Sequence, residues 1–309
     1  MIETEGLTRK FGELTAVEDL TLNVKKGEVF GFLGPNAAGK TTTIRLLCCL
    51  IEKTRGKARI GNFDVDNKDD RIKIRKMVGL LPESVGLYDS LSAYRNLDFY
   101  GRLYEVSAEK RKENIQSLLQ LLDIWGRRND LVGTFSKGMK QKIAIARSLI
   151  HDPELLFLDE PTANLDPEAS KTVRDFILNL KKQKRTIFIN THNLDEAERL
   201  CDRIGIINTQ LVTVGSPESL AKGLHARKTV LQLESVNRNV LAAVEKLPMI
   251  KNVQTLDNKL VLEMDEPEMD NPELIRAVVA AGGKIQFVTE LRSTLEDVYL
   301  KLIKESKSR

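Results

Sequence analysis

The chain has 309 residues, of which 41% are hydrophobic and 30% charged, a composition typical of a globular protein with one large and one smaller domain. A net charge of +4 is too small to indicate a nucleic-acid partner, and three cysteines exclude a disulfide-based framework. No apolar run approaches the ~18 residues of a membrane-spanning helix, and the three histidines have no metal-ligand spacing.

The first 33 residues alternate between apolar and polar side chains, a pattern that predicts antiparallel strands. The strands are expected over Ile2–Leu7, Leu14–Val17, Leu20–Val24 and Val29–Leu33. The segment Lys25-Lys26-Gly27-Glu28 has the composition of a turn and should join the last two strands.

A glycine-rich segment follows the last of these strands. It reads Gly34-Pro35-Asn36-Ala37-Ala38-Gly39-Lys40-Thr41. The pattern G-x-x-x-x-G-K-T, set between a strand and a helix that continues from Thr42, favours a phosphate-binding loop over an ordinary turn. Backbone N–H groups at a helix N-terminus attract anions. We therefore expect Lys40 to reach the β- and γ-phosphates of a nucleotide, and the Thr41 hydroxyl to ligate Mg²⁺.

Helices are expected in the next part of the chain. Residues from about 90 to 130 are predicted to be mainly helical, with one amphipathic helix over Ala108–Leu122. A further helix begins after Ser136, a residue of the N-cap type, and presents on one face Met139, Ile143, Ala146 and Ile150. A helix start with Ser136 and Gly138 is either an ordinary cap or another anion site, and the pattern leaves both explanations open.

Two acidic residues follow a second apolar strand. Leu155–Leu158 is typical of a buried strand in a parallel sheet, and Asp159, Glu160 and Pro161 come directly after it. Parallel strands end at the edge where α/β proteins bind their ligands. Asp159 is therefore expected to support Mg²⁺, and Glu160 to be the general base for an attacking water. Two solvated loop carboxylates are the alternative, which the neighbouring phosphate loop disfavours.

A lone histidine ends a third apolar run. Thr186–Asn190 predicts another core strand, and Thr191 and His192 follow it. A single histidine is usually structural. At the end of another core strand, however, His192 is a candidate sensor of the γ-phosphate.

The pattern changes after residue 220. Pro217 marks a helix start that leads into a linker, expected at 221–228, between domains at 1–220 and 229–309. Strands are predicted over Thr229–Leu233, Ile250–Leu256, Leu260–Met264 and Ile285–Thr289. Helices are predicted over Asn239–Leu247, from a cap at Asn271-Pro272 to the residue before Gly282, and over Thr294–Ile303. The order β-α-β-β-α-β is ferredoxin-like, and the acidic segment 263–270 is expected to be a solvated loop.

Taken in order, the motifs of residues 1–220 resemble those of an ATP-binding cassette (ABC) ATPase. Gly34–Thr41 matches the Walker A motif, Phe135–Met139 the signature motif, Leu155–Glu160 Walker B, Ala163–Asp166 the D-loop and His192 the switch histidine. Glu83 stands where the Q-loop glutamine is expected, and Phe11 where an aromatic residue stacks on adenine. By this resemblance, the nucleotide site comprises Phe11, residues 34–42, and Ser136 with Gly138 of a second copy.

The resemblance also implies an architecture. It implies an α/β P-loop NTPase cassette with a parallel-sheet core, an antiparallel β subdomain and a helical subdomain. A small α+β domain at 229–309 is typical of one branch of the family. Two such cassettes enclose two ATP molecules head to tail, with each phosphate loop facing the Ser136 region of the partner. The metal would be held by Thr41, Glu83 and Asp159.

Three positions depart from the family pattern. Ala37 replaces a glycine, and alanine costs on the order of 1 kcal/mol there if the position needs φ > 0. Lys137 and Met139 alter the signature motif, and Glu83 replaces a glutamine. The last two departures resemble an exporter branch for drugs, polysaccharides or sodium. Its permease is a separate chain, and the segment 86–100 resembles the region that faces it.

We therefore expect an ATPase with ATP and Mg²⁺ as cofactors, coupled to an integral-membrane permease. The acidic N-terminal residues have no signal-peptide layout, so a cytoplasmic chain held peripherally at the inner face of the membrane is expected. A soluble ABC ATPase of translation or DNA repair is the alternative, but such chains usually carry two cassettes or a long coiled coil. A binding module without activity conflicts with the intact Lys40, Asp159 and Glu160. The role of the C-terminal domain stays open between dimer support, permease docking and ligand sensing.

Overall fold

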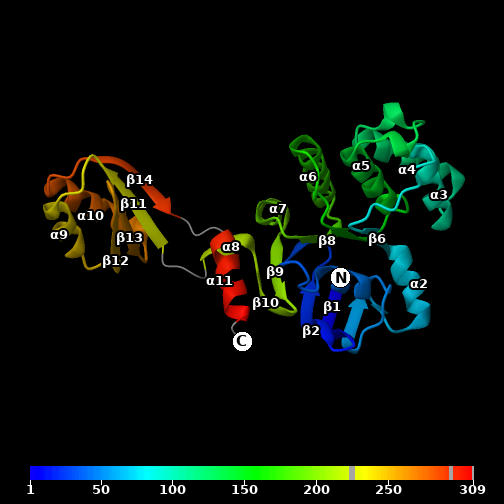
Figure 1. Cartoon of the computed structure of the whole chain (residues 1–309), viewed down its shortest axis with the longest axis horizontal. Coiled ribbons are helices and arrows are strands. Elements are labelled where there is room, and N and C mark those ends of the chain that lie inside the picture. Colours follow the sequence, from blue (N-terminus) through cyan, green and yellow to red (C-terminus); the bar gives the residue numbers. More distant parts are fainter. Residues whose placement is uncertain (223–226, 292–294, 308–309) are drawn as a thin grey trace. The chain divides into compact units, whose positions relative to one another are not determined.

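The computed structural model describes residues 1–222, 227–291 and 295–307 (Figure 1). The chain divides into two compact units, Met1–Pro217 and Glu218–Arg309. The boundaries expected from the sequence, at residues 220 and 229, stay a prediction. Part of the expected linker, residues 223–226, lies outside the described residues, as does Thr294. Among the described residues, no helix has both the length and the apolar character needed to span a membrane.

A six-stranded sheet forms the centre of the first unit, with strand order β10-β9-β3-β8-β7-β6. Its strands are β3 (Val29–Leu33), β6 (Val78–Leu81), β7 (Leu155–Asp159), β8 (Thr186–Thr191), β9 (Arg203–Asn208) and β10 (Gln210–Gly215). All neighbours are parallel except β10, which runs antiparallel to β9. Four aromatic rings carried by these strands contact one another: Phe30, Phe32, Phe157 and Phe188. The centroids of the Phe32 and Phe188 rings are 5.3 Å apart. The α/β class with a parallel core is thereby confirmed.

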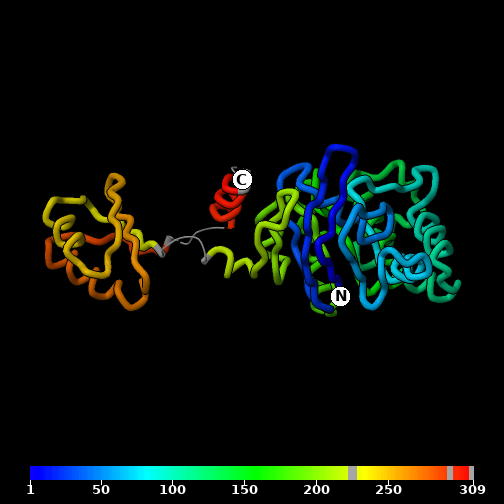
Figure 2. Tube along the Cα trace, turned by 90° about the horizontal axis from the view of Figure 1, so that it is seen from below, coloured from blue at the N-terminus to red at the C-terminus, as the bar shows by residue number. Residues whose placement is uncertain are grey.

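A second, antiparallel sheet has the order β2-β1-β4-β5. Its strands are β1 (Ile2–Phe11), β2 (Leu14–Val24), β4 (Arg55–Ile60) and β5 (Phe63–Asp64), and Figure 2 shows the first two side by side. The prediction of two strands in 14–24 is wrong. Asp19 takes a left-handed φ of 51°, and shifts in register let one bent strand continue its pairing with β1.

Helices surround the central sheet. They are α1 (Lys40–Leu47), α2 (Lys68–Met77), α3 (Ala93–Leu103), α4 (Ala108–Leu121), α5 (Lys137–Leu149), α6 (Pro167–Lys182) and α7 (Leu194–Leu200). Helices α3, α4 and α5 contact one another and form the predicted helical part of the unit (Figure 1). Ser92, Ser107 and Ser136 each cap the helix that follows, because their hydroxyls accept a bond from a backbone N–H of the first turn.

The second unit begins with α8, which starts at the end of the first unit (Pro217–Lys222). Then follow β11 (Arg227–Leu233), α9 (Arg238–Glu245), β12 (Asn252–Leu256), β13 (Lys259–Met264), α10 (Pro267–Ala280), β14 (Ile285–Leu291) and α11 (Leu295–Lys307). The four strands form an antiparallel sheet in the order β12-β13-β11-β14. Two helices inserted in the β-α-β-β-α-β order confirm the ferredoxin-like arrangement.

The start of α10 differs from the prediction. The helix begins at Pro267, so part of the expected acidic loop belongs to its first turn, and Pro272 lies inside the helix instead of capping it. Proline suits the first helical position, and Glu268 and Asp270 are acidic residues at the positive end of the helix dipole. Pro272 removes one backbone hydrogen bond from the second turn, and the buried Leu274 further along holds the helix on the core.

Candidate active site

The glycine-rich loop between β3 and α1 is fixed by close backbone contacts. A Cβ on Gly34 would lie 2.3 Å from the carbonyl oxygen of Ile207, and one on Gly39 would lie 2.3 Å from that of Ala16. Gly39 also has φ = 97°, a conformation that favours glycine. Both glycines of the motif are therefore required by the fold around the loop as well as by any ligand inside it.

Ala37, which replaces a family glycine, has φ = 64°. The position therefore takes the left-handed conformation, which costs about 1 kcal/mol for a residue with a Cβ. The loop keeps this conformation because its neighbours are held: Ala38 donates its N–H to the Pro35 carbonyl at 3.2 Å and accepts one from Thr209 at 3.0 Å.

Lys40 points into the loop that precedes it. Its Nζ donates to the carbonyl oxygens of Gly34 at 2.7 Å and Pro35 at 3.1 Å. Burial lowers the pKa of Lys40, while the carboxylates of Glu160, Asp159 and Glu83 act in the opposite direction. The ammonium group is thus held at the centre of the loop, close to three acids, while Thr41 and Thr42 form the first turn of α1 half-buried.

Parallel pairing brings the ends of three strands to one edge. Leu33 pairs with Thr191 and Asp159 pairs with Asn190, so Gly34, Glu160 and His192 follow neighbouring strands. This is the edge at which open α/β sheets bind ligands. The sequence predicted each strand end separately, and the register of the sheet makes them one site.

Asp159 and Glu160 have different surroundings at this edge. Asp159 is only 3% exposed and accepts a hydrogen bond from Asn190 Nδ2 at 3.1 Å. Glu160 has φ = 52°, and its N–H donates to the Asn190 carbonyl at 2.9 Å. A non-glycine residue in this conformation is strained, and such strain is concentrated at functional sites.

The carboxylate of Glu160 meets the ring of His192. Glu160 Oε2 lies 2.8 Å from His192 Nδ1, and the Glu160 side chain is 15% exposed against 61% for His192. The contact fixes the direction of the carboxylate while leaving the ring open to solvent. A carboxylate oriented by a histidine at a ligand-binding edge is an arrangement that can accept a proton from water.

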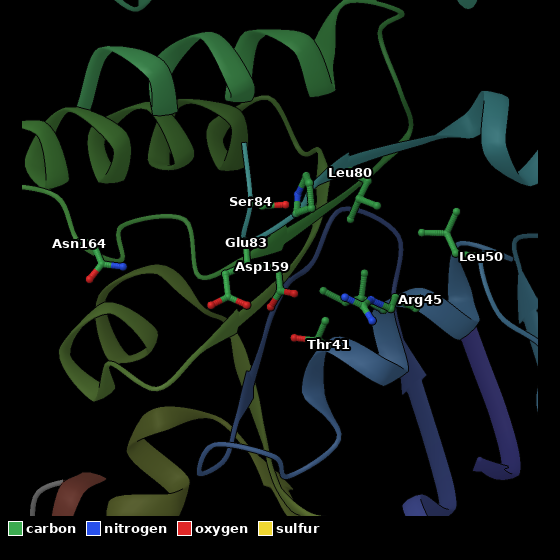
Figure 3. A pocket seen from close by; sticks show the side chains of 10 residues that line it. Thr41, Arg45, Leu50, Leu80, Glu83, Ser84, Asp159 and Asn164 are labelled. Carbon is green, nitrogen blue, oxygen red and sulfur yellow. The ribbon is translucent and has the colours of Figure 1, made fainter. Parts of the chain in front are cut away.

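A cavity of about 370 Å³ opens beside this edge (Figure 3). Thr41 of α1, Asp159 of β7 and Glu83, which follows β6, all line it, and Figure 3 shows their side chains gathered in the same part of the cavity. Arg45 and Asn164 also reach it. The three residues proposed from sequence as metal ligands are therefore brought together.

The signature segment lies apart from this cavity, at the start of α5. Ser136 Oγ accepts the N–H of Met139 at 3.3 Å, so the residue is an ordinary N-cap within its own chain. Gly138 is buried, and a Cβ there would lie 2.7 Å from the Cβ of Ala169 on α6. The sequence assigned Gly138 only to a partner's phosphate, whereas the structure adds a packing role within the chain.

Phe11 lies at the end of β1 and is 45% exposed. It is not among the residues that line the cavity, and its ring is covered by the guanidinium of Arg9, 4.3 Å from the ring centroid.

Three residues around the site were missed from the sequence. Gln141 Nε2 donates to the Pro161 carbonyl at 2.8 Å, and Arg147 Nη1 donates to the carbonyls of Val85 at 2.6 Å and Gly86 at 2.9 Å. Helix α5 thus holds both the segment after Glu160 and the segment after Glu83. No periodicity could reveal these long-range bonds to backbone atoms.

Glu196, the third of these residues, is almost fully buried in α7. Its carboxylate accepts bonds from Thr191 Oγ1 at 2.7 Å and Thr162 Oγ1 at 2.9 Å. Burial raises the pKa of Glu196, and these hydrogen bonds only partly oppose the shift. Glu196 thus ties the segment after β7 to the end of β8. The sequence indicated it only as an acidic residue in the first turn of a helix that begins after Asn193.

Family models match both parts of the chain. The model described as "ABC transporter" matches residues 17–163, and the model described as "ATP-binding protein DrrA1-3-like, C-terminal domain" matches residues 215–303.

Curated relatives resemble the chain over nearly its whole length. The bacitracin transport ATP-binding protein BcrA of Bacillus licheniformis is 35% identical over 306 residues, which cover 98% of this chain and 97% of the relative. The Nod factor export ATP-binding protein I of Rhizobium sp. is 32% identical over 302 residues, with 97% and 96% covered. The linearmycin resistance ATP-binding protein LnrL of Bacillus subtilis is 31% identical over 283 residues, with 91% and 89% covered.

Solved structures resemble the first unit. A dimeric post-hydrolysis state of the ATP-binding cassette MJ0796, bound to ADP and Pi, aligns with a TM-score of 0.64 at 25% identity and covers 70% of this chain and 98% of that one. An ATP-binding subunit of an ABC transporter aligns with a TM-score of 0.65 at 29% identity, covering 72% and 92%.

Proposed function

This chain belongs to the ABC transporter family of ATP-binding proteins, and from that premise we propose that it is the ATP-hydrolysing subunit of an exporter whose membrane permease is a separate chain. The observation that carries the proposal is the single sheet edge where Lys40, Asp159 and the Glu160–His192 pair meet. The relative in bacitracin transport supports a role in transport, and the relative in Nod factor export supports its direction. The chain would then work at the cytoplasmic face of the membrane.

The loop residues bind the nucleotide. Backbone N–H groups of residues 34–42 and the ammonium of Lys40 contact the phosphates, and the loop is already shaped for this by Gly34 and Gly39. Phe11, exposed at the end of β1, stacks on the adenine. These contacts position the γ-phosphate beside Glu160.

The residues present fit Mg²⁺. Thr41, Asp159 and Glu83 offer oxygen atoms to one cavity, and Mg²⁺ prefers oxygen ligands, with one or two carboxylates and the substrate phosphates completing its shell. No group of three acidic, histidine or cysteine side chains that could cage a metal occurs among the described residues, which agrees with a metal shared with ATP. When bound, Mg²⁺ would neutralise charge on the phosphate oxygens.

Glu160 accepts the proton of the attacking water. His192 orients the carboxylate through the 2.8 Å contact and, with its ring exposed, can also reach the γ-phosphate. Asn190 holds Asp159 by its side chain and Glu160 by its carbonyl, so the two acids keep different directions and different roles.

A second copy completes the site. Dimeric solved cassettes support a pair of copies. The family resemblance adds the head-to-tail arrangement, in which the Ser136 segment of one copy faces the phosphate loop of the other. ATP binding would close this dimer and hydrolysis would reopen it, and this cycle would drive the permease.

The test is Glu160→Gln. The amide cannot take the proton, so turnover should fall about 10²–10⁴-fold, while Mg-ATP still binds and an ATP-bound dimer accumulates in gel filtration. Lys40→Ala is the contrast, because it removes a phosphate contact and should weaken nucleotide binding itself. Parent-like turnover by Glu160→Gln would show that Glu160 is not the base.

A further inference from the structure

A charged side chain lies behind the proposed adenine platform. Arg9 and Phe11 are two residues apart on β1, so both side chains lie on the same face of the sheet. The guanidinium carbon of Arg9 lies 4.3 Å from the centroid of the Phe11 ring, well within the range of a cation–π interaction. One face of the ring is therefore covered, while the Phe11 side chain as a whole stays 45% exposed.

Arg9 is itself held in place by backbone. Its Nη1 donates to the carbonyl oxygen of Glu52 at 2.7 Å, and the surrounding strand end is bound to the same segment: Thr54 donates its N–H to Thr8 and accepts one from Lys10. The guanidinium thus has a fixed anchor on one side and the ring on the other.

One atom of Arg9 has an unusual position. Nε is buried and has no hydrogen-bond partner among the described residues. A buried donor without a partner is costly and calls for an explanation. The orientation keeps both the Nη1 bond to Glu52 and the contact with the Phe11 ring, while Nε stays without a partner among the described residues.

The ring needs such support. Phe11 stands next to the turn at Gly12, and the residue paired with it, Leu14, is 68% exposed, so the ring does not lie in the core. A half-exposed ring that rotates freely presents its stacking face only part of the time. Fixing it in advance lowers the entropy lost on binding.

We propose that Arg9 is a positioning residue for the nucleotide base: it holds the Phe11 ring from behind, so that the free face is ready to stack on a purine. The stack would be guanidinium, phenyl ring and base in that order. The proposal rests on the function proposed above, because it takes Phe11 as the adenine contact.

The experiment measures binding of Mg-ADP and Mg-pyrophosphate to the full chain by calorimetry. ADP carries the base and is not hydrolysed, while pyrophosphate has no base. Arg9→Met should weaken ADP binding about two- to five-fold, the range of an exposed cation–π contact, and leave pyrophosphate binding unchanged. Arg9→Lys keeps a cation and should recover part of the loss.

Lys10→Met is the matched control, because it removes the same charge one residue away on the opposite face of β1. It should change neither affinity. In a Phe11→Ala chain, Arg9→Met should have no further effect, because the ring that it positions is gone. Thermal unfolding of each variant reports whether the strand end stays folded, and Arg9→Lys keeps the test valid if Arg9→Met unfolds.

The outcomes separate the two proposals. Phe11→Ala should weaken ADP binding about ten- to hundred-fold, the range of base–aromatic stacking, and an unchanged affinity would remove both the adenine contact and the role of Arg9. If Phe11→Ala weakens binding but Arg9→Met does not, only the inference about Arg9 is overturned. Equal losses for ADP and pyrophosphate would mean that Arg9 acts on the phosphates, which also overturns it.

Discussion

Glu83 is the acid of the cavity that departs from the family pattern. It follows β6, the edge strand of the central sheet, whereas Asp159 belongs to an interior strand. Arg147 of α5 holds the segment directly after it, at Val85 and Gly86. A change at Glu83 can therefore act on the metal and on the segment expected to face the permease.

We expect Glu83→Gln to leave ATP binding nearly unchanged, because the amide keeps an oxygen ligand and loses only the charge. The ratio of permease-stimulated to basal ATPase should change, since the side chain lies where the cavity joins that segment. Both activities are measured with the permease in membranes. Glu109→Gln, at an exposed acid of α4, is the control. An unchanged ratio in Glu83→Gln would identify Glu83 as an ordinary loop acid.

Glu196 predicts a dependence of stability on pH. Its folded-state pKa is raised by burial above the ordinary value of about 4.3. The folded chain therefore binds a proton more readily than the unfolded chain, so this contribution to stability is fully present below the ordinary pKa and is lost as pH rises through the raised one.

The comparison is with Glu196→Gln, which keeps an acceptor oxygen for one of the two threonine hydroxyls and does not titrate. As pH falls from 7 through the raised pKa to the ordinary value, the parent should gain stability relative to this variant. Each 1 kcal/mol would appear as about 2–4 °C in the melting temperature of a unit of this size. A melting-temperature difference that stays constant over this range would contradict the assignment.

Among the elements, α5 connects the most parts of the site. Its first turn packs Gly138 on α6, its middle binds the Pro161 carbonyl through Gln141, and its last turn binds the segment after Glu83 through Arg147. A movement of this helix would therefore reach both the segment after Glu160, the proposed base, and the segment after Glu83, a proposed metal ligand.

The contact between α5 and α6 can be tested by changing the size of the two side chains that meet there. Gly138→Ala should destabilise the first unit by about 1–3 kcal/mol, because the new Cβ would lie 2.7 Å from Ala169. Adding Ala169→Gly should restore part of this loss, reduced by the ~1 kcal/mol that glycine costs inside a helix. Melting temperatures check both expectations.

The single and the double variant also distinguish the packing role of Gly138 from its role in turnover. In the double variant, any remaining loss of turnover with ADP affinity intact reports the approach of Gly138 to the partner's nucleotide. Lys137 is the exposed neighbour of Gly138, and Lys137→Ala should change the melting temperature and the turnover only slightly. If the single variant Gly138→Ala melts like the parent, α6 does not require the glycine.

At the scale of the whole molecule, each unit has its own apolar core. The first core joins the two sheets of the cassette, from Ile2 and Leu22 to Phe30 and Phe188. The second includes Leu231, Leu262 and Val278 of the ferredoxin-like sheet and its helix. Separate cores predict separate unfolding transitions.

Calorimetry should therefore resolve two transitions. Mg-ADP should shift only the transition of the first unit to higher temperature. At a ligand concentration 100 times its Kd, the unfolding free energy of that unit should rise by about 2.7 kcal/mol. Leu262→Ala should shift only the transition of the second unit to lower temperature. Because Leu262 is fully buried, the unfolding free energy of that unit should fall by about 2–5 kcal/mol. One transition shifted by both changes would show that the units unfold together.

Features that depend on neighbours in the chain could be predicted from the amino-acid sequence. The phosphate loop was predicted because a strand, two glycines and a helix start lie within a few residues of one another. Ser136 was identified as a cap for the same reason. The β-α-β-β-α-β order could be predicted from periodicity, because alternation and helical spacing are local properties.

Features that depend on strand register and on close contact between distant segments became visible only in the folded chain. Local patterns do not encode that β7 and β8 end side by side, and this pairing is what places Glu160 against His192. They do not show that α6 covers Gly138, nor that Glu52 holds Arg9 over Phe11. They also misplaced the start of α10, because burial of Leu274 outweighed the penalty of Pro272. Distances between segments far apart in sequence are set by packing of the whole unit, and packing decided these contacts.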